Sequence, residues 1–213
     1  MKLKSFLVLA CIAIALFSLS AAVMAQEVQT KYDALLAKVK AGDQTADFQE
    51  LRFAYTETPQ YNPYGGVKVD YGKQMFDAYK AGQNDKALEY AAAILKDNYV
   101  DIDAHMISSL IYKKTGNTEK EKYHRFITSS LIKSIMRSGD GLKPETAFWV
   151  ITVNEEYVLL QALGLKFEAQ SKISLNGHDY DKIKVTDPET GKKLEIYFCI
   201  DKPFQWLGKS MKK

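Results

Sequence analysis

A turn that recurs at a fixed spacing is the feature that most limits how this chain can fold. Tyr79-Lys80-Ala81-Gly82 returns as Tyr112-Lys113-Lys114-Thr115-Gly116, and the two glycines are 34 residues apart. A period of this length is typical of folds that stack antiparallel helix pairs. Glycine enters the left-handed conformation that ends a helix without a side-chain penalty, so each glycine marks a reversal of the chain. The stretch Asp77–Tyr123 is therefore predicted to form an antiparallel helical repeat.

The second helix of this stretch resembles the corresponding helix of a tetratricopeptide unit. It carries Ala87-Leu88-Glu89 followed by Ala91 and Ile94, and small residues there let paired helices approach closely. Tyr99 stands where that family has proline, and Glu121 stands where it has a small alanine. The resemblance covers about one and a half units and implies a tetratricopeptide-like helical region.

Residues 1–25 are predicted to be a signal peptide and not part of the fold. Lys2 and Lys4 precede an apolar run from Phe6 to Leu19, and Val23-Met24-Ala25 offers small residues for cleavage. A cut after Ala22 is an alternative. Because the run is short for a membrane-spanning helix, we expect an exported protein, periplasmic or secreted, without stable membrane insertion after cleavage.

The charge of the exported part argues against a nucleic-acid or anionic-membrane partner. Without Lys2 and Lys4, 27 basic residues stand against 26 acidic ones. Cys11 lies inside the predicted signal peptide, where lipid attachment would leave most of the apolar run beyond the cysteine. Cys199 is then the one cysteine of the exported chain, and its apolar neighbours predict a buried, inert thiol in a strand.

The spacing of apolar residues predicts helices first and strands afterwards. The helices are expected at Thr30–Ala41, at a second segment through Phe48 and Tyr55, and at Asp70–Ala81, Asn84–Asp97, Ile102–Thr115 and Thr118–Arg137. Between the second and third, Thr58–Gly66 contains two prolines, a glycine pair and two tyrosines, which indicates an ordered loop.

The pattern changes after Ser138-Gly139-Asp140-Gly141. Strands are predicted at Thr146–Val153, Phe167–Leu175, His178–Val185 and Lys193–Asp201, with a short helix over Asn154–Leu163 and a hairpin turn at Asn176-Gly177. One buried face is expected to hold Ile173, Leu175, Ile183, Val185, Leu194, Ile196, Phe198 and Ile200. We therefore predict an α+β fold in which a helical region (26–138) precedes a small antiparallel β-meander (139–213) and packs with it as one unit.

The chain also resembles a family of exported bacterial proteins classed as domain of unknown function 4919. The resemblance is carried by Asp47–Tyr55, Tyr61–Gly65, the helical repeat, Gly177–Asp181 and Tyr197-Phe198. It implies a location in the envelope or outside the cell and a tetratricopeptide-like helical region. It names no catalytic residue.

Motifs for nucleotide, serine-hydrolase or zinc-protease chemistry are absent from the sequence. Asp101, Asp103 and His105 have a spacing that could offer three metal ligands, but helix capping by Asp101 or Asp103 is the interpretation that we favour. No histidine is near Cys199 in sequence, and the three histidines are scattered. We therefore predict no metal and no cofactor.

The aromatic group around Arg52 is the candidate ligand site. Arginine is rare in this chain, which has three arginines and 26 lysines. Arg52 lies on a helix face that is rich in aromatic residues. In a functional role, Arg52 would hold a carboxylate or phosphate while Tyr55, Tyr61 and Tyr64 stack beside it. In a structural role, it would pin the loop at Tyr61–Gly66 and pair with Glu50 or Asp47.

These features favour a non-catalytic protein that binds a protein or peptide partner on its helices, with the aromatic loop at the edge of the site. One alternative is an envelope enzyme that acts near Arg52 and Tyr61, or near His178 and Asp181 beyond the hairpin turn. Another is a structural subunit that assembles through an edge strand of the C-terminal sheet.

Overall fold

The computed structural model describes residue 26 and residues 29–65 and 69–210. The predicted signal peptide lies outside these ranges. A helix over 29–40 begins the fold and is followed by α2 (Phe48–Thr56), α3 (Val69–Lys80), α4 (Asn84–Asp97), α5 (Ile102–Lys114) and α6 (Thr118–Met136). In the described part of the chain, none of the helices is both long and apolar enough to cross a membrane.

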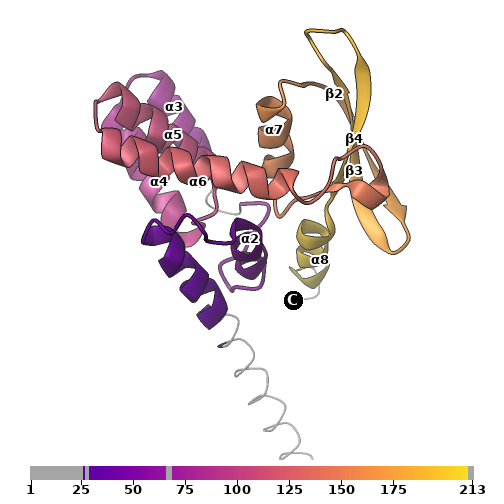
Figure 1. Cartoon of the computed structure of the whole chain (residues 1–213), viewed down its shortest axis with the longest axis horizontal. Helices are drawn as coiled ribbons and strands as arrows, with labels where there is room; N and C mark the ends of the chain where they lie inside the picture. Colours follow the sequence, from indigo (N-terminus) through magenta and orange to yellow (C-terminus); the bar gives the residue numbers. More distant parts are fainter. Residues whose placement is uncertain (1–25, 27–28, 66–68, 211–213) are drawn as a thin grey trace, which may run out of the picture.

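The two repeated turns have the conformation that their glycines predict. Gly82, between α3 and α4, has φ 73°, and Gly116, between α5 and α6, has φ 77°. Both helix pairs pack side by side (Figure 1), and α3, α4 and α5 share a core cluster that includes Met75, Ala87 and Ile107. The predicted bounds of α3 to α6 agree with the structure to within one residue at each end.

The second half of the chain builds a four-stranded sheet with flanking helices. Its elements are a 3-10 helix η2 (Pro144–Thr146), β1 (Phe148–Trp149), α7 (Val153–Ala162), β2 (Lys166–Leu175), β3 (His178–Thr186), β4 (Lys193–Cys199) and α8 (Asp201–Ser210). The strand order is β1-β4-β3-β2. The α+β class is confirmed, but the sheet is mixed and not wholly antiparallel, because β1 runs parallel to β4.

The apolar run at Thr146–Val153 forms only two strand residues although half of it is buried. Side chains satisfy backbone groups that a sheet ladder would otherwise bind. The Trp149 amide donates to Ser138 Oγ (2.8 Å), and the Ile151 amide donates to Glu155 Oε2 (2.8 Å). A buried apolar run is therefore compatible with irregular backbone wherever polar side chains reach it.

The hairpin between β2 and β3 turns at Asn176 (φ 52°) and Gly177 (φ 81°), as predicted for an Asn-Gly turn. This turn pairs Ile173 with Tyr180 and Leu175 with His178. Paired residues share a face, so Ile173 and Leu175 lie opposite Ile183, and the predicted common face is wrong for these two. Ile173 packs near Tyr180 on the outer face, and Leu175 is exposed.

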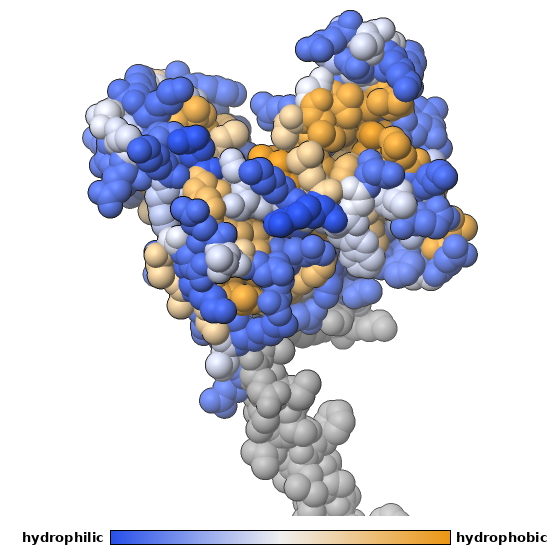
Figure 2. All heavy atoms as spheres, in the orientation of Figure 1, coloured by the Kyte–Doolittle hydropathy of each residue, from blue (hydrophilic) through white to orange (hydrophobic). Residues whose placement is uncertain are grey.

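One hydrophobic core joins the helices to the sheet. It includes Phe48 and Leu131 from α2 and α6 together with Ile183 and Phe198 from β3 and β4. α7 lies between the two parts, and α8, which the sequence patterns did not predict, lies below the sheet in Figure 1. Figure 2 shows a large apolar area over the sheet where it faces α7.

Candidate functional site

Arg52 is fully buried and forms a polar junction between three parts of the fold. Its Nε donates to Glu155 Oε1 (2.8 Å), and its Nη2 donates to Glu155 Oε2 and to the Trp149 carbonyl (3.0 Å). Its Nη1 lies 3.3 Å from Ser134 Oγ on α6. The expected partners Glu50 and Asp47 are therefore wrong, because Arg52 faces the core, where α7 supplies the carboxylate. Glu50 pairs instead with Lys31.

The three tyrosines grouped with Arg52 have different surroundings. Tyr61 is buried and donates its hydroxyl to the Ile151 carbonyl (2.7 Å). Tyr55 is also buried, yet it lines a pocket, and its hydroxyl reaches the Gln60 carbonyl (3.3 Å). Tyr64 lines the same pocket, is 41% exposed and lies near Trp206 of α8. Among the four predicted ligand residues, Tyr55 and Tyr64 therefore face a cavity.

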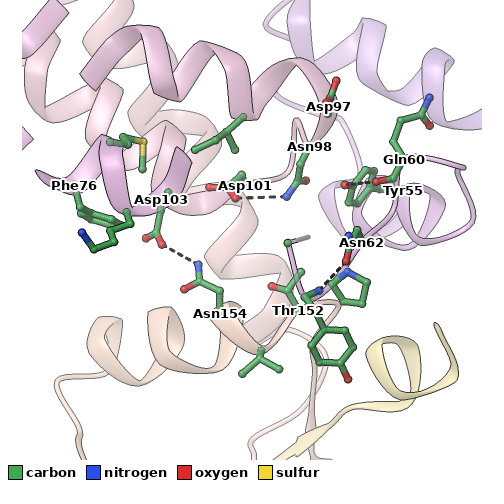
Figure 3. A pocket seen from close by; sticks show the side chains of 18 residues that line it. Tyr55, Gln60, Asn62, Phe76, Asp97, Asn98, Asp101, Asp103, Thr152 and Asn154 are labelled. Carbon is green, nitrogen blue, oxygen red and sulfur yellow. Dashed lines mark hydrogen bonds between the residues drawn. The ribbon is translucent and has the colours of Figure 1, made fainter. Parts of the chain in front are cut away.

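This pocket has a volume of about 860 Å³, within the range of ligand sites. Its walls come from the end of α2, the loop after it, the start of α3, the turn from α4 to α5 and the start of α7 (Figure 3). The lining combines apolar side chains with amides and three aspartates. It comprises Tyr55, Gln60, Asn62, Pro63, Tyr64, Gly65, Gly72, Lys73, Met75, Phe76, Ile94, Asp97, Asn98, Asp101, Asp103, Thr152, Val153 and Asn154.

The aspartates of the pocket combine helix capping with an unusual proton affinity. Asp101 caps α5 through the Ala104 amide (2.9 Å), which confirms the capping interpretation. Burial raises the pKa of Asp101 to about 7, and burial also raises the pKa of Asp103, which accepts a hydrogen bond from Asn154 (2.8 Å). Burial therefore destabilises the ionised forms of Asp101 and Asp103, and a cation in the pocket would offset this desolvation cost.

Asn98 contributes an unused acceptor beside Asp101. Its Nδ2 lies 3.5 Å from Asp101 Oδ2, whereas its buried Oδ1 has no hydrogen-bond partner among the residues that the structure describes. Figure 3 shows Asn98 and Asp101 side by side, with Asn62 across the pocket from Asn98. Because amide side chains both donate and accept, this wall can bind a peptide backbone as well as a charged group.

His178 and Asp181, an alternative site in the sequence prediction, do not meet. His178 Nδ1 pairs with Asp201 Oδ2 (2.5 Å) beside Trp149, whereas Asp181 lies on the other face of β3. Two residues three positions apart in a strand point to opposite faces. No histidine is near Cys199 in sequence, but the hairpin brings His178 close to it in space. Cys199 is buried, as predicted.

Asp181 instead forms a buried carboxyl pair with Glu156 of α7. Gln170 Nε2 donates to Asp181 Oδ2 (2.7 Å), and the protonated Glu156 donates to the Asp181 carboxylate. Burial and the neighbouring Asp181 charge raise the pKa of Glu156 to about 9, so Glu156 is neutral at pH 7.

The other two histidines form a neutral pair between α5 and α6. His105 is fully buried, and its Nε2 lies 3.0 Å from the Tyr99 carbonyl, so that nitrogen carries the proton. Its Nδ1 must then accept from His124 Nδ1 (2.9 Å). Burial lowers the pKa of His105 to about 3 and of His124 to about 4. His105 therefore faces His124 and joins no ligand group with Asp101 and Asp103.

The sequence prediction missed the contribution of α7. Glu155 lies on the same helical face as Val158 and Leu159, one turn later, and both are buried. A glutamate on an apolar helix face indicates a buried partner of opposite charge, and Arg52, a rare arginine on an apolar face, is the complementary signal. Asp103 and Asn154 gave no comparable signal.

Comparisons with known proteins place the chain in a family but supply no activity. Neither the curated proteins nor the solved structures contain a match to this chain. A family model described as a domain of unknown function, DUF4919, matches residues 18–208 and so includes every residue of the pocket, the carboxyl pair and the histidine pair. The chain belongs to the DUF4919 family.

Proposed function

We propose that this chain is an exported, non-catalytic binding protein of the bacterial envelope, and that its pocket holds a short protein or peptide segment with a basic side chain. The observation that carries the proposal is the cavity of about 860 Å³ whose wall contains three aspartates. Export is inferred from the signal-like sequence of residues 1–25.

The chemistry of the wall supports this class of ligand. Among the described residues of the wall, Asp97, Asp101 and Asp103 outnumber the one lysine, Lys73, which itself pairs with Asp77 (2.8 Å). An ammonium or guanidinium group beside Asp101 would favour its ionised form and so recover part of the cost of burying it. Phe76 and Tyr64 add apolar contact area for the rest of the segment.

The test uses three fluorescent octapeptides that are identical except at one central position, which is lysine, acetyl-lysine or glutamate. We expect the lysine peptide to bind at least about tenfold more tightly than the acetyl-lysine peptide, a difference of about 1.4 kcal/mol. Asp103→Asn should remove most of this preference and leave acetyl-lysine binding nearly unchanged, because only the charge contact is lost. Fluorescence polarisation at several salt concentrations measures all of these affinities.

Glu119→Gln is the matched control, because it removes an exposed carboxylate in the first turn of α6, outside the pocket. The control should retain the full lysine preference. Equal affinity of the wild-type chain for all three peptides, or the absence of binding to any of them, would contradict the proposal.

The raised pKa values of Asp101 and Asp103 favour a second candidate, an enzyme that uses these carboxyl groups for acid and base catalysis. The two functions differ in the fate of the bound peptide. A binding protein returns the lysine peptide intact after a day of incubation, as read by mass spectrometry. New product masses that disappear in Asp103→Asn would establish the enzyme instead.

A further inference from the structure

A mixed cluster of side chains lies on the outer face of the sheet, away from the pocket. It contains His178 from β3, Cys199 from β4 and Asp201 from the first position of α8. One ligating atom from each of these residues lies within 4.8 Å of the other two. No other such group occurs among residues 26, 29–65 and 69–210.

The register of the hairpin explains why these three residues meet. Tyr180 pairs with Cys199, and the Ile200 amide donates to the Asp179 carbonyl (2.9 Å), so the ladder places His178 opposite Asp201. Side chains two positions apart in a strand share a face, which brings His178 beside both Cys199 and Asp201.

We propose that His178, Cys199 and Asp201 form a binding site for one divalent ion of the zinc type. Thiolate, imidazole and carboxylate are the ligands that Zn²⁺ prefers, and three protein ligands with one open position are a common arrangement. At Zn–ligand distances of about 2.0–2.3 Å, tetrahedral ligand atoms are about 3.3–3.7 Å apart. The cluster needs shifts on the order of 1 Å, and rotation of the half-exposed His178 side chain, which lengthens its 2.5 Å contact with Asp201 Oδ2, can supply them.

The surroundings of the cluster resemble those of a metal site. The Asp179 amide holds Asp201 Oδ1 (2.8 Å), so Oδ2 is the oxygen directed at His178. The ring of Trp149 lies against the imidazole, with centroids 6.0 Å apart. Such contacts orient ligands before the ion arrives. Cys199 and Asp201 are buried, whereas the His178 side chain is 46% exposed and leaves a path for the ion and for a bound water.

Binding has a simple proton balance. The Cys199 thiol releases its proton to solvent, and His178 gives up the Nδ1 proton that it donates to Asp201 so that Nδ1 can coordinate the ion. A cysteine nucleophile is a weaker interpretation of the same residues, because the buried thiol hydrogen-bonds to the Asp201 carboxylate and not to the imidazole.

The experiment titrates the metal-depleted, purified chain with Co²⁺ and then with Zn²⁺. We expect one equivalent of Co²⁺ to produce a thiolate-to-cobalt charge-transfer band, which Zn²⁺ removes by displacement, and a melting temperature that rises with Zn²⁺ concentration. The charge-transfer band requires the thiol, so surface histidines and carboxylates cannot produce it.

Two ligand variants and one control complete the test. Cys199→Ser should abolish the band, and His178→Ala, at a half-exposed position that tolerates truncation, should weaken Zn²⁺ binding by more than about 100-fold. Asp179→Asn is the control, since its side chain is bonded to Ser174 and Lys172 outside the cluster and should leave the band unchanged. A folded wild-type chain without the band, or Zn²⁺ binding undiminished in both ligand variants, would overturn the proposal.

Discussion

Glu155 and Glu156 are consecutive residues of α7, both are buried, and the fold accommodates them in opposite ways. Glu155 receives two hydrogen bonds from Arg52 and one from the Ile151 amide. Glu156 faces Asp181, and among the described residues no cation pairs with it and no hydrogen bond reaches its Oε1. Glu155 is thus stabilised as an anion, and Glu156 as a neutral acid.

The difference shows that two physical solutions exist for a carboxyl group in a core. A bidentate arginine offsets desolvation by direct charge pairing, and the pair then depends on both partners being present. Protonation avoids the charge altogether, and stability then depends on pH. Each solution can be broken by a different experiment.

Arg52→Met should have the largest effect, because it leaves Glu155 buried without its cation while keeping similar side-chain volume. We expect a loss of about 3–5 kcal/mol in the free energy of unfolding. Urea denaturation at pH 7 measures it. This result would make Arg52 a structural residue and separate it from ligand binding at Tyr55 and Tyr64.

The double variant Arg52→Met, Glu155→Leu tests whether the loss comes from the unpaired charge. Because the stranded carboxylate is removed, the double variant should be more stable than Arg52→Met alone. A loss below about 1 kcal/mol for Arg52→Met, a value typical of exposed ion pairs, would contradict the assignment of a buried pair.

Glu156→Gln should change the pH dependence of stability more than the stability itself. The folded chain keeps the Glu156 proton until about pH 9, whereas the unfolded chain releases it near pH 4.5, so the wild-type stability falls as pH rises through this window. One proton contributes at most about 1.4 kcal/mol per pH unit. Glutamine replaces the neutral acid with a neutral amide and should remove the contribution of Glu156 to this slope, whereas Asp101, with a pKa of about 7, still contributes below pH 7.

Denaturation of both chains from pH 5 to pH 9 measures the two slopes, and Glu119→Gln, at an exposed position, should retain the wild-type slope. A Glu156→Gln variant with the wild-type slope would show that Glu156 is ionised in the folded chain, which would make the two glutamates alike.

The buried contacts of Glu155 and Glu156 show how much of this structure the sequence alone could predict. Helical spacing and turn residues located α3 to α6 and the hairpin, because both signals are local. The partners of Arg52 and Asp181 are about 100 and 25 residues away in α7, and no local pattern encodes which side chains a fold brings together. The pocket was found in part, since Tyr55 and Tyr64 line it, but Asp103 and Asn154 meet only through tertiary packing.

The His105–His124 pair extends the comparison to buried bases and should give a pH dependence of opposite sign. Both imidazoles are neutral in the folded chain, with pKa values of about 3 and about 4, against 6.5 when unfolded. The unfolded chain binds more protons below pH 6.5, so stability is complete above that pH and falls as pH is lowered toward 4.

His124→Asn keeps a donor at the position of Nδ1 but removes one titrating group. We expect the acid slope to shrink by on the order of 1 kcal/mol per pH unit between pH 6.5 and 4. Guanidinium denaturation in this range measures the effect. An unchanged acid slope would mean that His124 is not held neutral by the fold. Adding Glu156→Gln should also remove the contribution of Glu156 to the slope at higher pH, while the part of the acid slope that comes from His105 remains.

Tyr157→Phe should have the smallest effect, because it removes a contact at the exposed rim of the Glu156 network. The Tyr157 hydroxyl donates to Gln170 Oε1 (3.0 Å), and this bond orients the Gln170 amide so that its Nε2 faces Asp181. Tyr157 is 42% exposed, so water can replace the lost donor, and we expect a change below about 0.5 kcal/mol at pH 7 with the wild-type pH slope retained. Urea denaturation at pH 5, 7 and 9 measures both quantities. If the pH dependence of stability flattens as it does in Glu156→Gln, then the orientation of Gln170, and not burial alone, keeps the proton on Glu156. The contrast with Glu155 would then depend on a hydrogen-bond network that reaches the surface.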